Sequence, residues 1–124
     1  MKKNPALNLL AQPTVLDPIT LLVGTTIMDL PAPLRSRLKD RVESLPLVYI
    51  HAVLSRAPET REIITPLFSD TFDAMELAEE LNLADYTGAL TVIAPSLPEP
   101  TLVLQELQMI CPDVQVKLEQ RAPH

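Results

Sequence analysis

The feature that most constrains the fold is the stretch from Thr91 to Leu118, which reads as strand, helix and strand. Leu90 to Ile93 is apolar and β-branched, and it is long enough for a buried strand but too short for a helix. Apolar side chains then recur at helical spacing between Val103 and Cys111, so one face of a helix is apolar. Pro112 ends this helix. Apolar and polar residues alternate from Val114 to Glu119, which predicts a half-exposed strand.

The start of that helix carries its own signals. Ser96 stands three residues before Glu99, the spacing of a capping box, in which each side chain satisfies a free main-chain N–H. Pro98 falls in the first turn, where a missing N–H costs little. We therefore expect the helix to begin at about Ser96.

A shorter copy of the same pattern lies near the N-terminus. Asp29-Leu-Pro-Ala-Pro corresponds to Ser96-Leu-Pro-Glu-Pro, and a β-branched run precedes each, Thr25 to Ile27 in one case and Thr91 to Ile93 in the other. The chain thus predicts two βαβ-like halves.

The remaining elements follow from periodicity and from breakers. Ile19 to Met28 is expected to be a strand, with a helix starting at Asp17-Pro18 as the alternative. We expect a helix over Pro33 to Leu45, a strand over Leu47 to Leu54, a long loop or a loop with an edge strand over Ser55 to Phe68, and a helix over Asp70 to Leu83 capped by Asp70 or Ser69.

These elements predict a small α/β domain with a four-stranded or five-stranded sheet packed by helices. A ferredoxin-like α+β fold is the alternative, if the 70–83 helix is an insertion. We expect an extended arm over residues 1–17, a single domain over 18–120 and a tail over 121–124.

Composition excludes several functions. The chain has only two glycines, so it has no glycine-rich phosphate cradle, and we expect no cofactor. Its single Cys111 cannot form an intramolecular disulfide, and a buried position at a helix C-terminus would raise the pKa of its thiol. The apolar runs are too short to cross a bilayer, so we expect a cytoplasmic protein that does not bind membranes.

Charge is distributed unevenly along the chain. Residues 1–61 carry eight bases against five acids, whereas residues 62–116 carry ten acids and no Lys or Arg. The net charge of −6 argues against nucleic acid as a partner, although four bases flank the helix that starts at Pro33. This asymmetry favours a protein partner with a basic surface, or a homo-oligomer in which one half meets the other. The candidate partner-binding residues are the acids of the 70–83 helix: Asp73, Glu76, Glu79 and Glu80.

His51 is the only internal histidine and therefore the candidate general base. Its candidate carboxylate partners are Glu59, Asp70 and Asp73. The acids of the 70–83 helix lack a histidine at a ligand offset, so we expect a solvated acidic face and no metal site.

The chain also resembles the STAS domains, small α/β modules related to anti-sigma-factor antagonists. The resemblance rests on Gly24 to Leu34 before a helix, Leu47 to Ile50 as a central strand, Phe68 to Thr71 opening the acidic helix, and Leu90 to Ser96 as strand and turn. In that family a Ser or Thr at the start of the corresponding helix is the phosphorylated switch. The resemblance places this switch at Ser69 or Thr71.

Together these observations predict a small acidic protein-interaction or regulatory module, switchable by phosphorylation. The alternative is a small enzyme whose site lies at the carboxyl ends of the strands, with His51 as general base.

Overall fold

The computed structural model describes residues 17–39 and 41–121 of the 124-residue chain. The expected N-terminal arm and C-terminal tail fall outside these residues, apart from Asp17 and Arg121.

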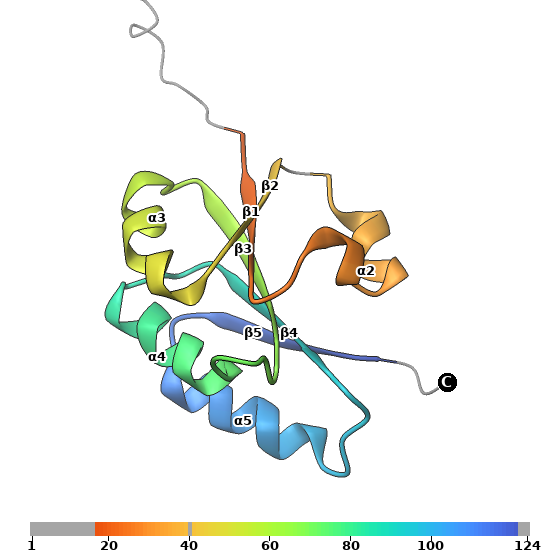
Figure 1. Cartoon of the computed structure of the whole chain (residues 1–124). Helices are drawn as coiled ribbons and strands as arrows, with labels where there is room; N and C mark the ends of the chain where they lie inside the picture. The colour runs from red at the N-terminus through yellow and green to blue at the C-terminus, as the bar shows by residue number, and fades with distance from the viewer. Residues whose placement is uncertain (1–16, 40, 122–124) are drawn as a thin grey trace, which may run out of the picture.

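Within these residues, five strands form one sheet in the order β2-β1-β3-β4-β5, and every neighbouring pair is parallel (Figure 1). The strands are β1 (Ile19–Val23), β2 (Arg41–Leu45), β3 (Thr60–Pro66), β4 (Ala89–Ala94) and β5 (Gln115–Gln120). The prediction of an α/β sheet packed by helices is confirmed in its five-stranded form. The ferredoxin-like alternative is wrong, because it requires antiparallel pairing.

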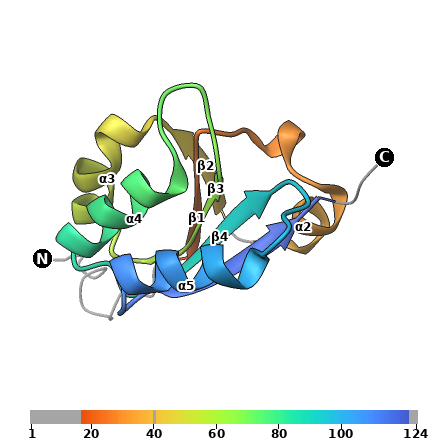
Figure 2. The same cartoon turned by 90° about the horizontal axis from the view of Figure 1, so that it is seen from below.

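The helices divide unequally between the two faces of the sheet (Figures 1 and 2). In the described chain, α2 (Ala32–Arg37) covers one face, and α3 (Ile50–Arg56), α4 (Ala74–Leu83) and α5 (Pro100–Ile110) cover the other. Two short 3₁₀ helices, η1 (Ile27–Asp29) and η2 (Leu47–Tyr49), precede α2 and α3. Right-handed crossovers produce this division, because the chain moves one way from β1 to β2 and the other way from β2 to β3 and onward.

The core has two parts, one on each face of the sheet. The larger part joins inward-facing residues of the strands to α3, α4 and α5, and its side chains include Leu21, Ile63 and Leu77, which are fully buried. The smaller part lies under α2. Its buried members are Leu22, Leu30, Leu34, Ile64 and Ile93.

The two predicted βαβ halves exist, as β1–α2–β2 and β4–α5–β5 at opposite edges of the sheet. The predicted strand at 90–93 is confirmed as β4. The predicted strand at 19–28 forms only over its first half, as β1, because the chain turns at Gly24 and Ile27–Asp29 form η1. The alternative helix that would start at Asp17-Pro18 is wrong. The alternating residues after Val114 form β5, as predicted.

The predicted continuous helix over Pro33 to Leu45 is wrong. α2 ends at Arg37, and residues 41–45 form the edge strand β2, in which Val42 pairs with Thr20 of β1. Leu34 and Val42 do contact the same smaller core, as their apolar spacing indicated. The spacing belongs to a helix followed by a strand, and not to one continuous helix.

The predicted strand over Leu47 to Leu54 is also wrong, because these residues form η2 and most of α3. The segment from Ser55 to Phe68 contains β3, which lies between β1 and β4 at the centre of the sheet, where a loop or an edge strand was expected. The chain passes from β2 through η2 and α3 to β3, so α3 is the crossover helix between these two parallel strands.

Helix caps differ from the expected ones. At α4 the cap is Asp73, whose carboxylate accepts from the main-chain N–H of Glu76 at 2.9 Å, while the Glu76 carboxylate accepts from the N–H of Asp73 at 3.0 Å. This capping box replaces the predicted caps Ser69 and Asp70. At α5 the helix starts at Pro100 after Glu99, so the predicted capping box at Ser96 does not form.

None of the helices in the described ranges has the length and hydrophobicity needed to cross a bilayer.

Candidate binding site at the carboxyl edge of the sheet

The strand order creates a switch point between β1 and β3, whose following segments leave the sheet in opposite directions. In parallel sheets of this kind, ligands bind in the crevice outside the carboxyl ends of the strands at such a point. Residues 24–31 follow β1, and residues 67–73 follow β3. The candidate site therefore lies between these two loops.

The two loops meet where Gly24 faces the ring of Phe72. Gly24 has a φ of +78°, and a Cβ at this position would lie 2.6 Å from the Phe72 ring. Both the left-handed backbone and the close approach require glycine here. The ring of Phe72 is consequently fixed against the end of β1.

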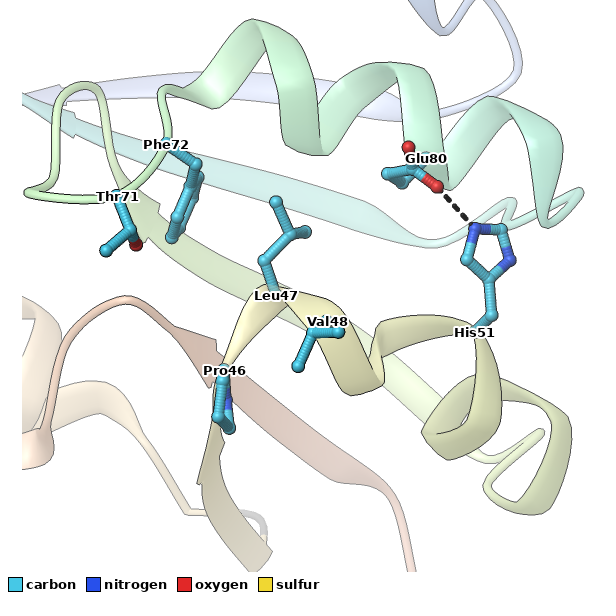
Figure 3. A pocket seen from close by; sticks show the side chains of 7 residues that line it. All are labelled: Pro46, Leu47, Val48, His51, Thr71, Phe72 and Glu80. Atoms are coloured by element: carbon cyan, nitrogen blue, oxygen red, sulfur yellow. Dashed lines mark hydrogen bonds and ion pairs between the residues drawn. The ribbon is translucent and has the colours of Figure 1, made fainter.

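Two adjoining cavities open at this edge, with volumes of about 530 and 440 Å³. We call the larger one the His51 pocket and the smaller one the switch-point pocket, and the two together the edge groove. The His51 pocket is lined by Pro46, Leu47, Val48, His51, Thr71, Phe72 and Glu80 (Figure 3). The switch-point pocket is lined by Gly24, Thr25, Thr26, Asp29, Ser44, Leu45, Pro46, Leu47, Thr71 and Phe72. Because four lining residues are shared, a ligand of several residues could occupy both.

The His51 pocket is apolar at its centre and charged at one end. Leu47 from η2 and Phe72 from the loop after β3 point toward one another across the pocket (Figure 3). At the far end His51 Nε2 lies 2.6 Å from Glu80 Oε1, which links α3 to α4. The two side chains are 50% and 39% exposed, so their pair contributes at most about 1 kcal/mol to stability.

His51 lies in the first turn of α3, not on the predicted strand, and it does not contact its predicted carboxylate partners. Glu59 precedes β3, where its carboxylate lies 3.7 Å from Arg41, and Asp70 follows β3. The length of the strand, about 20 Å, separates these two acids. Asp73 caps α4. The carboxylate that reaches His51 is Glu80, which had been expected only in the acidic face.

The acidic face of α4 consists of residues with different roles. Asp73 and Glu76 hold each other in the capping box, and Glu80 holds His51. Glu79 is exposed on the same helix. No group of three or more potential metal ligands occurs among the described residues.

The two candidate phosphorylation sites differ in accessibility. The Ser69 hydroxyl donates to the carbonyl of Phe72 at 2.9 Å and accepts from the N–H of the same residue, so it closes the turn before α4. Thr71 is exposed and lines both pockets of the edge groove. Of the two candidates, Thr71 is the one that is exposed in the edge groove.

At the other end of the edge groove, Thr26 Oγ1 donates to Asp29 Oδ2 at 2.9 Å across η1. Two arginines also reach this loop: Arg35 donates to the carbonyls of Met28 and Leu30, and Arg121 donates to the carbonyl of Asp29. Their hydrogen bonds fix the course of the loop after β1.

Large exposed apolar side chains gather around the same edge. Those on the segments that follow β1, β2 and β3 are Ile27, Met28, Val48, Tyr49 and Phe68. Apolar groups exposed next to a groove are typical of surfaces that bind another molecule.

Cys111 lies away from this edge, buried at the C-terminus of α5. Its thiol donates to the carbonyl of Leu107 at 3.3 Å, and burial raises the pKa of the thiol. It therefore serves as a core side chain, as the sequence predicted.

Sequence reasoning found three of the residues that line the His51 pocket, namely His51, Thr71 and Glu80. It missed the apolar part, Leu47 and Phe72, because these look like ordinary core residues. The position of Gly24 as one of only two glycines, directly after a strand, was the available signal for a close approach.

Comparison of the chain with models of protein families, with curated proteins and with solved structures gave no match. The resemblance to STAS domains therefore stays a prediction.

Proposed function

We propose that the protein is a non-enzymatic interaction module that binds a basic, partly apolar segment of a protein partner in the edge groove. The observation that carries this proposal is the composition of the carboxyl edge. The segments that connect β1, β2, β3 and β4 to their following helices contain four acids, Asp29, Asp70, Asp73 and Glu99, and no Lys or Arg. Two bases from outside these segments, Arg35 and Arg121, reach the edge at the loop after β1, where they donate to main-chain carbonyls. The same edge carries the exposed apolar side chains.

Complementary charge supports this choice of partner. An acidic rim attracts a basic segment and accelerates its encounter, while the apolar floor supplies contact area. Glu79 extends the acidic rim along α4. We also place the module in the cytoplasm, because nothing in its composition requires an oxidising compartment.

The test selects peptides from a random library against the full chain and measures their affinities. We expect selected peptides to combine Lys or Arg with Leu or Phe. The double variant Asp70→Asn with Glu79→Gln should weaken their binding about fivefold, or roughly 1 kcal/mol.

A second double variant, which removes the same number of negative charges at another place, is the matched control. Asp85 and Asp113 are exposed in turns at the opposite edge of the sheet, and Asp85 has a φ of 57°, which asparagine tolerates. The double variant Asp85→Asn with Asp113→Asn should change affinity less than about twofold. Peptides without basic residues, or equal losses in both double variants, would contradict the proposal.

We further propose Thr71 as the site of a phosphorylation switch. A phosphate there would add a charge of about −2 beside Asp70 and Asp73 and would occupy the groove, so it would repel a basic segment. Thr71→Glu should weaken binding of the selected peptides, whereas Thr71→Val should not. Equal binding by both variants would count against the switch.

One observation favours a second function, a small enzyme with His51 as general base. Its imidazole lies at hydrogen-bond distance from Glu80 at the end of a pocket, an arrangement that orients a histidine for proton transfer. A screen of hydrolase and isomerase substrates, repeated with His51→Gln, tests it. Activity that survives this substitution would exclude His51 as the base.

Self-association, with the basic half of one copy against the acidic half of another, also stays a prediction. Sedimentation of the full chain at low and high salt would check it, since such an assembly should dissociate as salt screens the charges.

A further inference from the structure

The His51 pocket has the chemistry of a receptor for one amphipathic cation. Four of its seven lining residues are apolar, Pro46, Leu47, Val48 and Phe72, and they surround the centre of the pocket. The carboxylate of Glu80 lies at one end of the pocket, and neither Lys nor Arg lines the pocket. A ligand that fits must therefore combine an apolar stem with a positively charged head.

The protein places one of its own polar side chains at that carboxylate. The Nε2 atom of His51 lies 2.6 Å from Glu80 Oε1. Both side chains are partly exposed, so the pair can separate without uncovering a buried charge. A cation that enters the pocket can replace His51 at Glu80.

We propose that the His51 pocket binds an arginine side chain of the basic partner segment, with Glu80 as its counter-ion and His51 displaced. Arginine fits better than lysine, because its planar guanidinium can donate two parallel hydrogen bonds to one carboxylate. Its methylene stem would pack against Leu47 and Val48. This inference rests on the proposed function, since it names the side chain that the edge groove recognises.

The volume of the pocket agrees with this choice. At about 530 Å³ it exceeds the space that one side chain fills, and it adjoins the switch-point pocket through Thr71 and Phe72. A residue next to the arginine in the partner can thus enter the same groove. We infer that recognition extends to an arginine with an apolar neighbour.

The test compares two tripeptides that differ in charge and hardly in shape. Acetyl-Leu-Arg-Leu-amide and its citrulline counterpart are titrated into the labelled full chain, and the NMR signals of the His51 ring and of the Leu47 and Val48 methyl groups are followed. We expect the arginine peptide to shift these signals and to bind about tenfold more tightly than the neutral one.

Two variants of the same pair should act in opposite directions. Glu80→Gln should weaken binding of the arginine peptide about tenfold, whereas His51→Ala, which removes the side chain that competes for Glu80, should tighten it severalfold. A merely structural role for the pair would move both affinities the same way. Glu106→Gln on the exposed surface of α5 is the control and should have no effect.

The outcomes separate this inference from the proposed function. Equal binding of the two tripeptides, unmoved His51 signals, or an unaffected Glu80→Gln variant would overturn the arginine receptor. The proposed function would still be tested separately. Selection of library peptides, and their affinity for the double variant Asp70→Asn with Glu79→Gln, decide whether the edge groove binds basic segments. A lysine tripeptide that binds more tightly than the arginine one would overturn the choice of guanidinium.

Discussion

At residue 62 the sheet buries a carboxylate on the face covered by α2. Arg37 donates to both oxygens of Glu62, at 3.0 and 2.8 Å, and the Thr91 hydroxyl donates to one of them at 2.5 Å. Burial alone would raise the pKa of Glu62. The hydrogen bonds from Arg37 and Thr91 and the positive charges of Arg37 and Lys117 outweigh burial and lower it.

This lowered pKa predicts a loss of stability in acid. Because the pKa of Glu62 is lower in the folded state, its contribution is present above the ordinary glutamate value of 4.5 and is lost as the pH falls through the folded value. Glu62→Gln should cost about 2 kcal/mol at neutral pH and flatten the stability curve below about pH 4.5. Urea unfolding across this range measures both effects.

Glu43 is the matched control, because it pairs with Arg41 at 3.2 Å with 55% of each side chain exposed. Glu43→Gln should change the free energy of unfolding by less than about 0.5 kcal/mol and leave its pH dependence below about pH 4.5 unchanged. If both variants behaved alike, the Arg37–Glu62 pair would not govern acid stability.

Single residues also show how far the sequence predicts the candidate site. The only internal histidine and the acids of α4 were visible in the sequence, and two of them, His51 and Glu80, do meet. Their meeting could not be predicted, because it depends on α3 being a helix. Glu62 was equally hidden, since the arginine that neutralises it lies 25 positions away.

At the scale of the elements, local pattern predicted what is buried and regular. β4 has an apolar run, α5 an apolar stripe and β5 an alternating pattern, and all three elements form, although α5 begins later than its predicted cap at Ser96. β2 is mostly exposed and has no alternation of its own, so its pairing with β1 decides its conformation. η2 and α3 contain β-branched residues that favour a strand, but they lie in the crossover between the parallel strands β2 and β3, and such crossovers are usually helical.

The capping box of α4 gives a test at this scale. Asp73→Ala removes the acceptor for the N–H of Glu76, so it should destabilise the protein by about 1 kcal/mol. Asp70, three residues earlier and exposed, caps no helix in the described chain, and Asp70→Ala should cost less than about 0.3 kcal/mol. Thermal unfolding of the two variants measures the difference. Equal losses would mean that α4 does not depend on its cap.

Over the whole molecule, burial is unequal between the centre of the sheet and its β2 edge. β1, β3 and β4 lie inside it and are almost entirely buried, whereas β2 is an edge strand. α2 is only six residues long and buries one side chain of its own, Leu34. The α2–β2 side should therefore open at a lower free energy than the centre.

Amide hydrogen exchange of the full chain, followed by mass spectrometry, measures that difference. Peptides that cover α2 and β2 should exchange at least about tenfold faster than peptides that cover β3, because few buried contacts close the edge. Binding of a basic peptide should slow exchange at the end of β2, since Ser44 and Leu45 line the edge groove. Protection of β2 equal to that of β3 would contradict the first expectation. Slowed exchange confined to α5 and β5 would place the partner on a different face of the molecule.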